Sequence, residues 1–244
     1  MSVWLTIPSA RPPAEVEPVL KAWRQQGYRV ALWRDWNAEP VSRLVDLVRP
    51  GVYSGYASAV NSLVAEVMDV DAAAEWFIAA GDDIWPDINW RAEEIAQQCR
   101  YHFEDLNQGN AKLETFGVMQ PTGDRGFGDA QGPYIDRVAG SAWIGREFAR
   151  RMYGGKGPLW PEYTHQFVDQ ELQEVAVKLG VFWQRPDLTH LHQHWGRPRE
   201  GERMGQASRM PEFLKEANSA AHWIKFKQLF EQRKALGFPG HEPI

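Results

Sequence analysis

Two adjacent aspartates, Asp82 and Asp83, could bind a metal ion. They follow Gly81 directly after an apolar run over residues 75–80, which reads as a buried strand. Two carboxylates in one tight turn repel each other unless a cation neutralises them, and carboxylate oxygens are ligands that Mg²⁺ and Mn²⁺ prefer. Such a cation could also bind a diphosphate and stabilise its charge as it leaves. An acidic turn that caps the next helix explains the pair alone equally well.

Three histidines form a second group with chemical potential. Alternate side chains of an extended segment share a face, so His190, His192 and His194 would lie together. One of them could complete the shell of a metal ion held by the aspartates. We expect a hard cation rather than zinc, because carboxylate and diphosphate oxygens dominate this shell. For any single histidine, an ordinary hydrogen-bonded side chain on a polar strand is the alternative.

Two further acids, Asp169 and Glu171, fall in the first turn of a helix that we expect to begin near Phe167. One of them could act as a general base that removes the proton of an acceptor hydroxyl. Acids in the first turn also interact favourably with the helix dipole, which is the structural explanation. Their spacing alone does not separate the two interpretations.

Alternating strands and helices must position these groups. Apolar runs predict strands over 3–7, 28–33, 52–53, 75–80, 115–119 and 181–183, and an extended segment over 188–192. Helical spacing predicts helices over 13–26, 41–48, 56–68, 90–107, 143–153, 167–179 and 211–234. This alternation predicts an α/β fold with an open, mostly parallel sheet flanked by helices. Ligands bind such sheets beyond the carboxyl ends of the strands, where Asp82 and Asp83 fall.

Composition restricts the class of protein. The chain has 244 residues, one cysteine and a formal net charge of -5. A lone cysteine cannot form an internal disulfide, and no apolar run approaches the roughly 20 residues that cross a bilayer, so we expect a cytoplasmic protein without membrane association. Residues 196–234 contain nine Lys or Arg and five Glu, a local charge of +4. We predict a catalytic domain over 1–195 and a basic helical extension over 196–244 that could contact phosphates, although a solvated helix face has the same composition.

Several short motifs follow one another along residues 3–195. They are Thr6-Ile7-Pro8-Ser9 with Arg11, Asp35 after the second strand, Gly55 to Asn61, Phe77 to Asp87, Gly140 to Arg146, the pair Asp169 and Glu171, and the histidine segment. In this order they resemble the nucleotide-diphospho-sugar transferases of the GT-A fold, which is Rossmann-like. The resemblance is strongest to small glycosyltransferases of bacteriophage and bacterial genomes.

The resemblance implies a role for each motif. Asp83 with His192 or His190 would bind Mn²⁺ or Mg²⁺, and Asp169 or Glu171 would be the catalytic base. Trp143 and Arg146 would lie on the acceptor side. The residues implied in binding the nucleotide sugar are Pro8, Ser9, Arg11, Asp35, Tyr56, Asn61 and Asp82.

The expected activity is that of a metal-dependent hexosyltransferase. It would move a sugar from a nucleotide-sugar donor, a UDP-sugar, to an acceptor hydroxyl such as that of a 5-hydroxymethylpyrimidine in phage DNA. The glycine-rich loop over 123–132 could close over the site and exclude water. A cell-surface glycan or a small metabolite is the alternative acceptor. A non-catalytic module that binds a nucleotide sugar or a nucleic acid is a further alternative, because a fold does not establish a function. We expect no obligate protein partner.

Overall fold

A central β-sheet organises the computed structural model, which describes residues 1–35, 38–41, 43–197 and 210–241. Within these residues the sheet has seven strands in the order β10-β6-β9-β4-β1-β2-β3. Neighbouring strands are parallel except at β9, which is antiparallel to both β4 and β6. The predicted mostly parallel α/β sheet is confirmed. Its strands are β1 (Ser2–Ser9), β2 (Arg29–Asp35), β3 (Leu47–Gly51), β4 (Ala74–Ala79), β6 (Val118–Pro121), β9 (Ala142–Gly145) and β10 (Phe182–Arg185).

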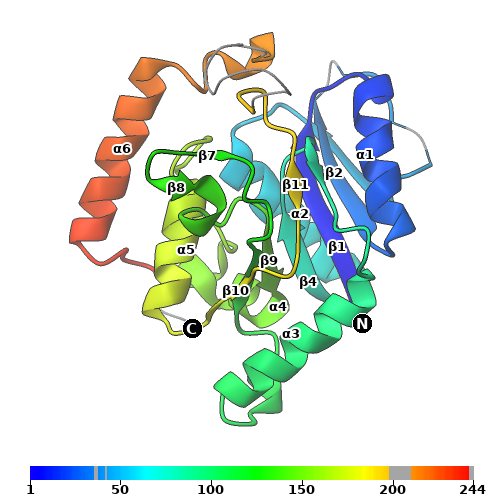
Figure 1. The fold of residues 1–244 in the computed structure, drawn as a ribbon, viewed down its shortest axis with the longest axis vertical. Helices are drawn as coiled ribbons and strands as arrows, with labels where there is room; N and C mark the ends of the chain where they lie inside the picture. Colours follow the sequence, from blue (N-terminus) through cyan, green and yellow to red (C-terminus); the bar gives the residue numbers. More distant parts are fainter. Residues whose placement is uncertain (36–37, 42, 198–209, 242–244) are drawn as a thin grey trace.

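Helices cover both faces of this sheet, with α2 behind it and α3 in front of it in Figure 1. Strands covered on both faces have near-continuous apolar runs, as β2 has over residues 30–33 and β4 over residues 76–79. The α-helices are α1 (Pro13–Gln25), α2 (Tyr56–Val70), α3 (Ala92–Leu106), α4 (Arg146–Arg151), α5 (Val168–Lys178) and α6 (Ala220–Ala235). Short 3-10 helices are η1 (Ala111–Leu113), η2 (Tyr134–Asp136), η3 (Met152–Gly155) and η4 (Glu212–Leu214). Among the described residues, none of the helices is long and apolar enough to span a bilayer.

Two short ladders lie beside the main sheet and shape its carboxyl edge. In one, β5 (Ile84–Trp85) pairs antiparallel with β11 (Leu191–His192). In the other, β7 (Gly128–Asp129) pairs antiparallel with β8 (Gly132–Pro133) inside the glycine-rich loop. The first ladder is anchored to α1, because Trp23 Nε1 donates a hydrogen bond to Ile84 O at 2.8 Å. The segment after β4 is thereby fixed against both α1 and β11.

Two predicted elements are wrong because short apolar runs do not distinguish strands from helices. A helix was predicted over 41–48, but the described residues there form a turn that leads into β3. Asp46 stabilises that turn, since its Oδ2 accepts a hydrogen bond from Val30 N at 2.8 Å. The third strand is thus β3 rather than residues 52–53. The helix predicted over 143–153 is instead the buried strand β9, followed by the short α4.

The helix predicted over 211–234 is two separate elements, η4 and α6. Ser219 starts α6, because its Oγ accepts a hydrogen bond from His222 N at 3.3 Å. Serine is a preferred N-cap residue, and this cap was the sequence signal for the interruption. The described part of the C-terminal extension, residues 210–241, packs on the core through Phe226 and Phe230.

Candidate active site

The ends of β1 and β4 lie side by side, because the two strands are parallel neighbours. Ser9 is the last residue of β1, and Asp82 follows β4. Ser9 Oγ donates a hydrogen bond to Asp82 Oδ2 at 2.6 Å, and Arg11 Nε donates one to Asp82 Oδ1 at 2.8 Å. Both oxygens of Asp82 are therefore held by the segment after β1. The structure brings together three of the residues predicted to bind a nucleotide sugar.

Asp83 faces His192 across the β5–β11 ladder. Asp83 Oδ1 lies 3.3 Å from His192 Nε2, and Gln193 N donates a hydrogen bond to Asp83 O at 2.9 Å. Gly81 makes room for this arrangement, since a Cβ atom there would lie 2.7 Å from Asp83 Oδ1. The predicted proximity of Asp83 and His192 is thus present in the structure.

The two aspartates differ in their electrostatic environment. Burial raises the pKa of Asp83, but the hydrogen bond and charge of His192, together with Arg11, outweigh burial and lower it below its ordinary value. Burial raises the pKa of Asp82 above its ordinary value despite Arg11. Arg11 also reaches the second aspartate, because its Nη2 lies 3.6 Å from Asp83 Oδ2. Asp83 is therefore the carboxylate better suited to carry a negative charge toward a ligand.

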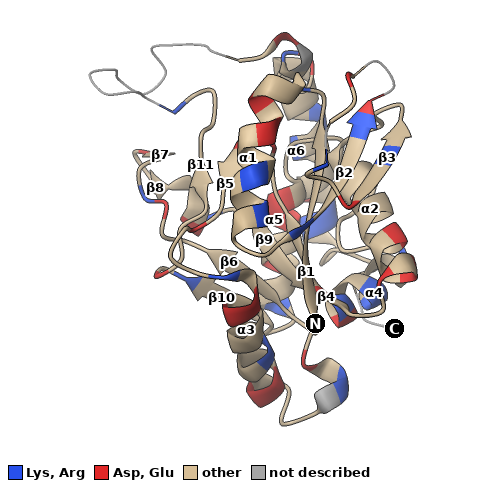
Figure 2. Ribbon diagram, turned by 90° about the vertical axis from the view of Figure 1, so that its right-hand side faces the viewer, with Lys and Arg blue, Asp and Glu red and all other residues tan. Residues whose placement is uncertain are grey.

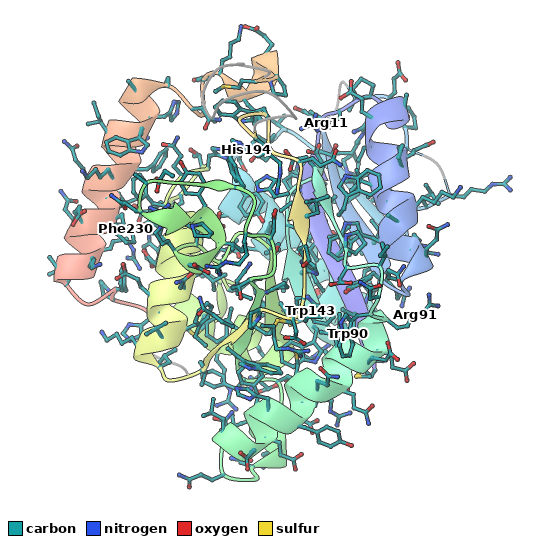
Figure 3. The ribbon with its side chains drawn as sticks, viewed as in Figure 1. Arg11, Trp90, Arg91, Trp143, His194 and Phe230 are labelled. Carbon is teal, nitrogen blue, oxygen red and sulfur yellow. The ribbon has the colours of Figure 1, made fainter. Side chains whose placement is uncertain are left out.

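Aromatic rings pack beside His192, with the centroids of Phe127 and His194 at 6.1 Å and 5.0 Å from its own. Phe127 of the glycine-rich loop stacks against His194 with ring centroids 4.9 Å apart, and Trp195 lies 4.6 Å from His194 on another side. Burial lowers the pKa of His194 to about 4. His194 is therefore a neutral ring at physiological pH, and its Nδ1 accepts a hydrogen bond from Gly196 N at 3.0 Å. Figure 3 shows His194 and Arg11 at the same end of the molecule, beyond the strand ends.

Asp169 lies in the first turn of α5, where its carboxyl group interacts electrostatically with His192. Burial raises the pKa of Asp169 to about 7, and His192 opposes that rise. The residue before α5, Phe167, has a left-handed backbone with φ of 68°, which is uncommon for a side chain of its size. Strained backbone of this kind often occurs where a structure fixes a functional group. A carboxyl group with a pKa near 7 has the property that a general base requires.

Glu171 does not share that position, which corrects its predicted role as a base. It is 1% exposed, and both its oxygens accept hydrogen bonds from Arg233 of α6. The hydroxyls of Tyr153 and Tyr163 each donate to it at 2.8 Å. Glu171 therefore anchors α6 to α5 and has no access to a substrate.

His190 also lies apart from Asp83, which corrects its prediction as a metal ligand. It is 2% exposed, its Nδ1 lies 3.2 Å from Ser141 Oγ, and its ring meets Trp23 edge-on at 5.0 Å. Burial lowers its pKa to about 3, so the ring is neutral. The strand pairing covers only residues 191–192, and of the three histidines predicted to share a face, His192 and His194 lie together with ring centroids 5.0 Å apart while His190 does not join them.

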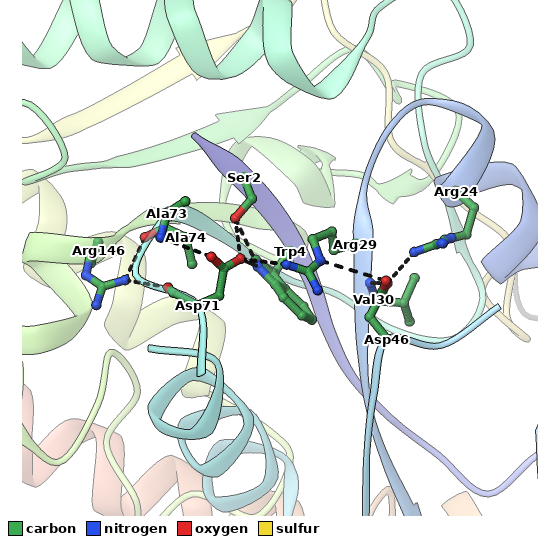
Figure 4. Close-up of polar contacts among 10 residues, drawn as sticks. All are labelled: Ser2, Trp4, Arg24, Arg29, Val30, Asp46, Asp71, Ala73, Ala74 and Arg146. Atoms are coloured by element: carbon green, nitrogen blue, oxygen red, sulfur yellow. Dashed lines mark hydrogen bonds and ion pairs between the residues drawn. The ribbon is translucent and has the colours of Figure 1, made fainter. Parts of the chain in front are cut away.

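Trp143 and Arg146, predicted on the acceptor side, belong to the scaffold. Trp143 is fully buried and meets Tyr28 edge-on at 5.6 Å (Figure 3). Arg146 lies near the start of β4, at the opposite end of that strand, where its guanidinium donates to the carbonyl oxygens of Asp71 and Ala74 (Figure 4). It also donates to Met68 O at 3.1 Å. Neither residue reaches the aspartate pair, so this prediction is wrong.

Of the other residues predicted to bind the nucleotide sugar, one is structural and the others lie near the carboxyl ends of the strands. Asn61 is buried, and its side chain bonds Leu159 N and Leu159 O, so it joins α2 to the segment before α5. The hydroxyl of Tyr56 donates a hydrogen bond to Ala80 O at 3.3 Å, just after β4, and burial together with the charges of Asp169 and Asp83 raises its pKa. Asp35 ends β2 at the edge that also carries Ser9. Pro8 precedes Ser9 in β1 and is half-buried.

Three cations of the C-terminal extension form ion pairs with acidic residues, whereas Lys225 and Lys227 lie over the rings of Phe226 and Trp223. Arg233 bonds Glu171, Lys234 bonds Glu174 at 2.6 Å, and Lys215 bonds Glu212 at 2.5 Å. Arg150 and Arg151 both pair with Glu147. Arg199, Arg203 and Arg209 lie outside the described residues. Figure 2 shows basic and acidic residues interspersed over the visible elements. Part of the positive charge predicted to contact phosphates is therefore paired with acidic residues of this chain.

Three or more metal-ligating side chains do not converge at any point in the described part of the chain. At the strand ends, the protein offers the pair Asp83 and His192 as donors of one carboxylate and one imidazole nitrogen. Sequence reasoning did not select Asp124, Arg197 and Phe127, which surround His192. The run Gly123-Asp124-Arg125-Gly126-Phe127 could have indicated them, because it places charged residues between glycines shortly after the strand predicted over 115–119.

No protein-family model matches the chain, and no curated protein matches its sequence. Solved structures that resemble it include the catalytic domain of Drosophila beta1,4-galactosyltransferase 7 in complex with xylobiose, at 15% sequence identity. That match covers 79% of this chain and 71% of the other, with a TM-score of 0.46. A likeness at this level identifies neither the substrates nor the site residues of this chain.

Proposed function

We propose that this chain is a GT-A-type glycosyltransferase that transfers a sugar from a UDP-sugar to an acceptor hydroxyl, with Mn²⁺ or Mg²⁺ as its cofactor. The observation that carries the proposal is the facing pair Asp83 and His192 at the carboxyl edge of a mostly parallel sheet. Burial raises the pKa of Asp169 to about 7, and the carboxyl group of Asp169 interacts electrostatically with His192. This edge is where α/β sheets bind nucleotides.

The two side chains fit a hard divalent cation. Asp83 Oδ1 and His192 Nε2 are 3.3 Å apart, so one carboxylate oxygen and one imidazole nitrogen face the same point. Mg²⁺ and Mn²⁺ are commonly bound through one or two protein ligands together with substrate phosphates, so a diphosphate would provide the remaining ligands. A cation bound there would stabilise the negative charge of the departing nucleoside diphosphate.

The other residues of the site bind and orient the donor in this proposal. Asp82, held by Ser9 and Arg11, would accept hydrogen bonds from the ribose hydroxyls. Arg11 lies beside both aspartates, so its guanidinium would interact with the diphosphate. Asp35 would contact the base from the end of β2. Together these groups would fix the anomeric carbon near the metal ligands, and positioning of this kind contributes much of the rate of a group transfer.

Asp169 would act as the general base. Its carboxylate would take the proton of the acceptor hydroxyl while the hydroxyl oxygen bonds to the anomeric carbon and the bond to the nucleoside diphosphate breaks. This direct displacement inverts the anomeric carbon. An outcome with retained configuration would remove the need for Asp169, so the product's stereochemistry checks the assignment.

The acceptor is the less constrained half of the reaction. A 5-hydroxymethylpyrimidine in phage DNA remains one candidate, and a glycan or small metabolite is the other. The ion pairs of Lys215, Arg233 and Lys234 favour the second, because DNA binding depends strongly on cations that neutralise phosphates.

Hydrolysis of the donor in water tests the proposal without knowledge of the acceptor. We expect UDP release from at least one UDP-sugar in the presence of MnCl₂, its loss on addition of EDTA, and its loss in Asp83→Asn. Glu174→Gln is the matched control, because it removes an exposed carboxylate on α5. Release that persists in EDTA would exclude the metal role. UDP binding without any turnover would favour a non-catalytic binding module.

A further inference from the structure

An ion pair between Asp124 and Arg197 encloses the backbone of His192. Asp124 follows the end of β6 in the glycine-rich loop, whereas Arg197 lies beyond β11. Arg197 Nη1 lies 2.7 Å from Asp124 Oδ2, and Arg197 Nη2 lies 2.5 Å from Asp124 Oδ1. Paired bonds of this kind between a guanidinium and a carboxylate fix both position and orientation. Asp124 is 7% exposed, so the pair is largely shielded from water.

Both members of the pair also hold the main chain of His192. Asp124 Oδ2 accepts a hydrogen bond from His192 N at 3.1 Å, and Arg197 Nη1 donates one to His192 O at 2.8 Å. The two polar groups of this residue's backbone are therefore both bound by the same ion pair. A longer strand would obtain such bonds from its ladder, but β11 pairs with β5 over only two residues, 191 and 192.

Glycines allow the loop to come close enough for these contacts. A Cβ atom on Gly123 would lie 2.6 Å from Leu188 O, and one on Gly126 would lie 2.8 Å from Arg197 Nη2. Gly123 N also donates a hydrogen bond to Leu188 O at 2.8 Å. The loop predicted to move over the site is thus joined to the β11 segment at Gly123 and at Asp124.

We infer that Asp124 and Arg197 are positioning residues that orient the imidazole of His192 toward Asp83. This inference rests on the proposed function, in which His192 binds the metal ion. Groups that fix a ligating histidine typically change metal affinity by about 10-fold to 100-fold when they are removed. Asp124 and Arg197 each bond the backbone of His192, so their effect on the metal ligands would pass through His192.

A second ion pair in the same loop provides a matched control. Arg125 and Asp136 form the same two-bond geometry, at 2.7 Å and 2.8 Å, but they are exposed and do not contact β11. Arg125→Gln therefore removes an equivalent bond from the loop without releasing His192. Arg197→Gln and Asp124→Asn are the test variants, and thermal unfolding of each shows whether the fold is retained.

The experiment has one readout that needs no metal and one that does. In metal-free protein labelled with ¹⁵N-histidine, we expect the His192 ring signals to shift and broaden in Arg197→Gln and Asp124→Asn, and to stay in place in Arg125→Gln. In electron paramagnetic resonance titrations with MnCl₂ and UDP, we expect a loss of Mn²⁺ affinity of about 10-fold to 100-fold in the two test variants only. In a His192→Ala background, Arg197→Gln should cause no further loss.

The outcomes separate this inference from the proposed function. Unchanged His192 signals and unchanged Mn²⁺ affinity in both folded test variants would overturn the positioning role. An additive loss in the His192→Ala background would overturn it as well. If wild-type protein with UDP binds no Mn²⁺, the proposed function fails, and the histidine signals of the metal-free protein still decide whether the ion pair orients His192. If Arg197→Gln unfolds, the milder Asp124→Asn provides the same test.

Discussion

Arg233 of α6 and Glu171 of α5 form a buried ion pair in which Arg233 Nη2 lies 2.6 Å from Glu171 Oε1. Arg233 also lies over the ring of Trp160, with its Cζ atom 3.6 Å from the ring centroid. Glu171 thus connects the C-terminal helix to the helix that carries Asp169. The carboxylate that resembles a catalytic base in the sequence is a structural one, and its neighbour two positions away is the candidate base.

This pair predicts a large effect on stability. Arg233→Met leaves the buried charge of Glu171 without its cation, so we expect a loss of about 3 to 5 kcal/mol in the free energy of unfolding, measured by urea denaturation. Lys234→Met is the matched control, because Lys234 and Glu174 join the same two helices at the surface, and it should cost less than about 1 kcal/mol. Loss of UDP release in Glu171→Gln at wild-type stability would instead restore the catalytic interpretation of Glu171.

Asp169 predicts opposite effects on stability and activity. Burial raises its pKa to about 7 from an ordinary value of 3.8, and the groups that face it are His192 and Tyr56. Between these values the folded protein binds more protons than the unfolded chain, so this carboxyl group makes the free energy of unfolding fall as the pH rises toward about 7. Asp169→Asn removes that dependence and should be more stable than wild type near pH 8. As a general base, Asp169 must be ionised, so sugar transfer should rise through about pH 7 and drop by about 100-fold to 10,000-fold in the variant.

Denaturation at about pH 5 and about pH 8, with transfer rates over the same range, checks both statements. Glu174→Gln should reproduce neither effect, since Glu174 lies on the same helix in an exposed ion pair. Equal stability of wild type and Asp169→Asn at both pH values would contradict the burial argument. Wild-type transfer by Asp169→Asn would contradict the base assignment.

Salt dependence tests the acceptor. Because Lys215, Arg233 and Lys234 of the extension pair with acidic residues of this chain, we expect binding of a duplex that contains 5-hydroxymethylcytosine to change less than about tenfold between roughly 50 mM and 200 mM salt in fluorescence anisotropy. An unmodified duplex is the control for base recognition. A decline of about 1,000-fold or more would indicate many phosphate contacts and would favour DNA as the acceptor.

The sequence predicts the sheet better than the details of the site, for physical reasons. Strands β1, β2 and β4 are continuous apolar runs bounded by turn residues, so their period and ends are legible. The four apolar residues of β9 carry no such period, and the same run fits a helix. The rule that ligands bind at strand ends predicts a site near Asp83, and the structure places Asp83 beyond the end of β4.

Which side of an element faces the site depends on distant contacts. Asp169 and Glu171 stand two positions apart on α5, and residues at that spacing do not share a helix face. Arg233 bonds Glu171 and thereby gives it a structural role. Because Arg233 lies far along the chain, no local sequence pattern predicts this contact. Likewise, the two-residue length of β11 turns His190 into the core against Trp23 while His192 reaches Asp83. The ion pair of Asp124 and Arg197 joins two loops and leaves no periodic trace in the sequence.

If Asp83 and His192 form a metal-dependent site for a nucleotide sugar, UDP binding must depend on a divalent cation, which titration calorimetry measures. We expect wild type to bind UDP in the presence of MnCl₂. Its affinity for UDP should fall by at least about tenfold when EDTA replaces MnCl₂, and by as much in Asp83→Asn and His192→Ala with MnCl₂ present. His190→Gln should keep the Mn²⁺ dependence, because His190 does not face Asp83. If wild type binds UDP equally well with MnCl₂ and with EDTA, or does not bind it in either, Asp83 and His192 do not form such a site.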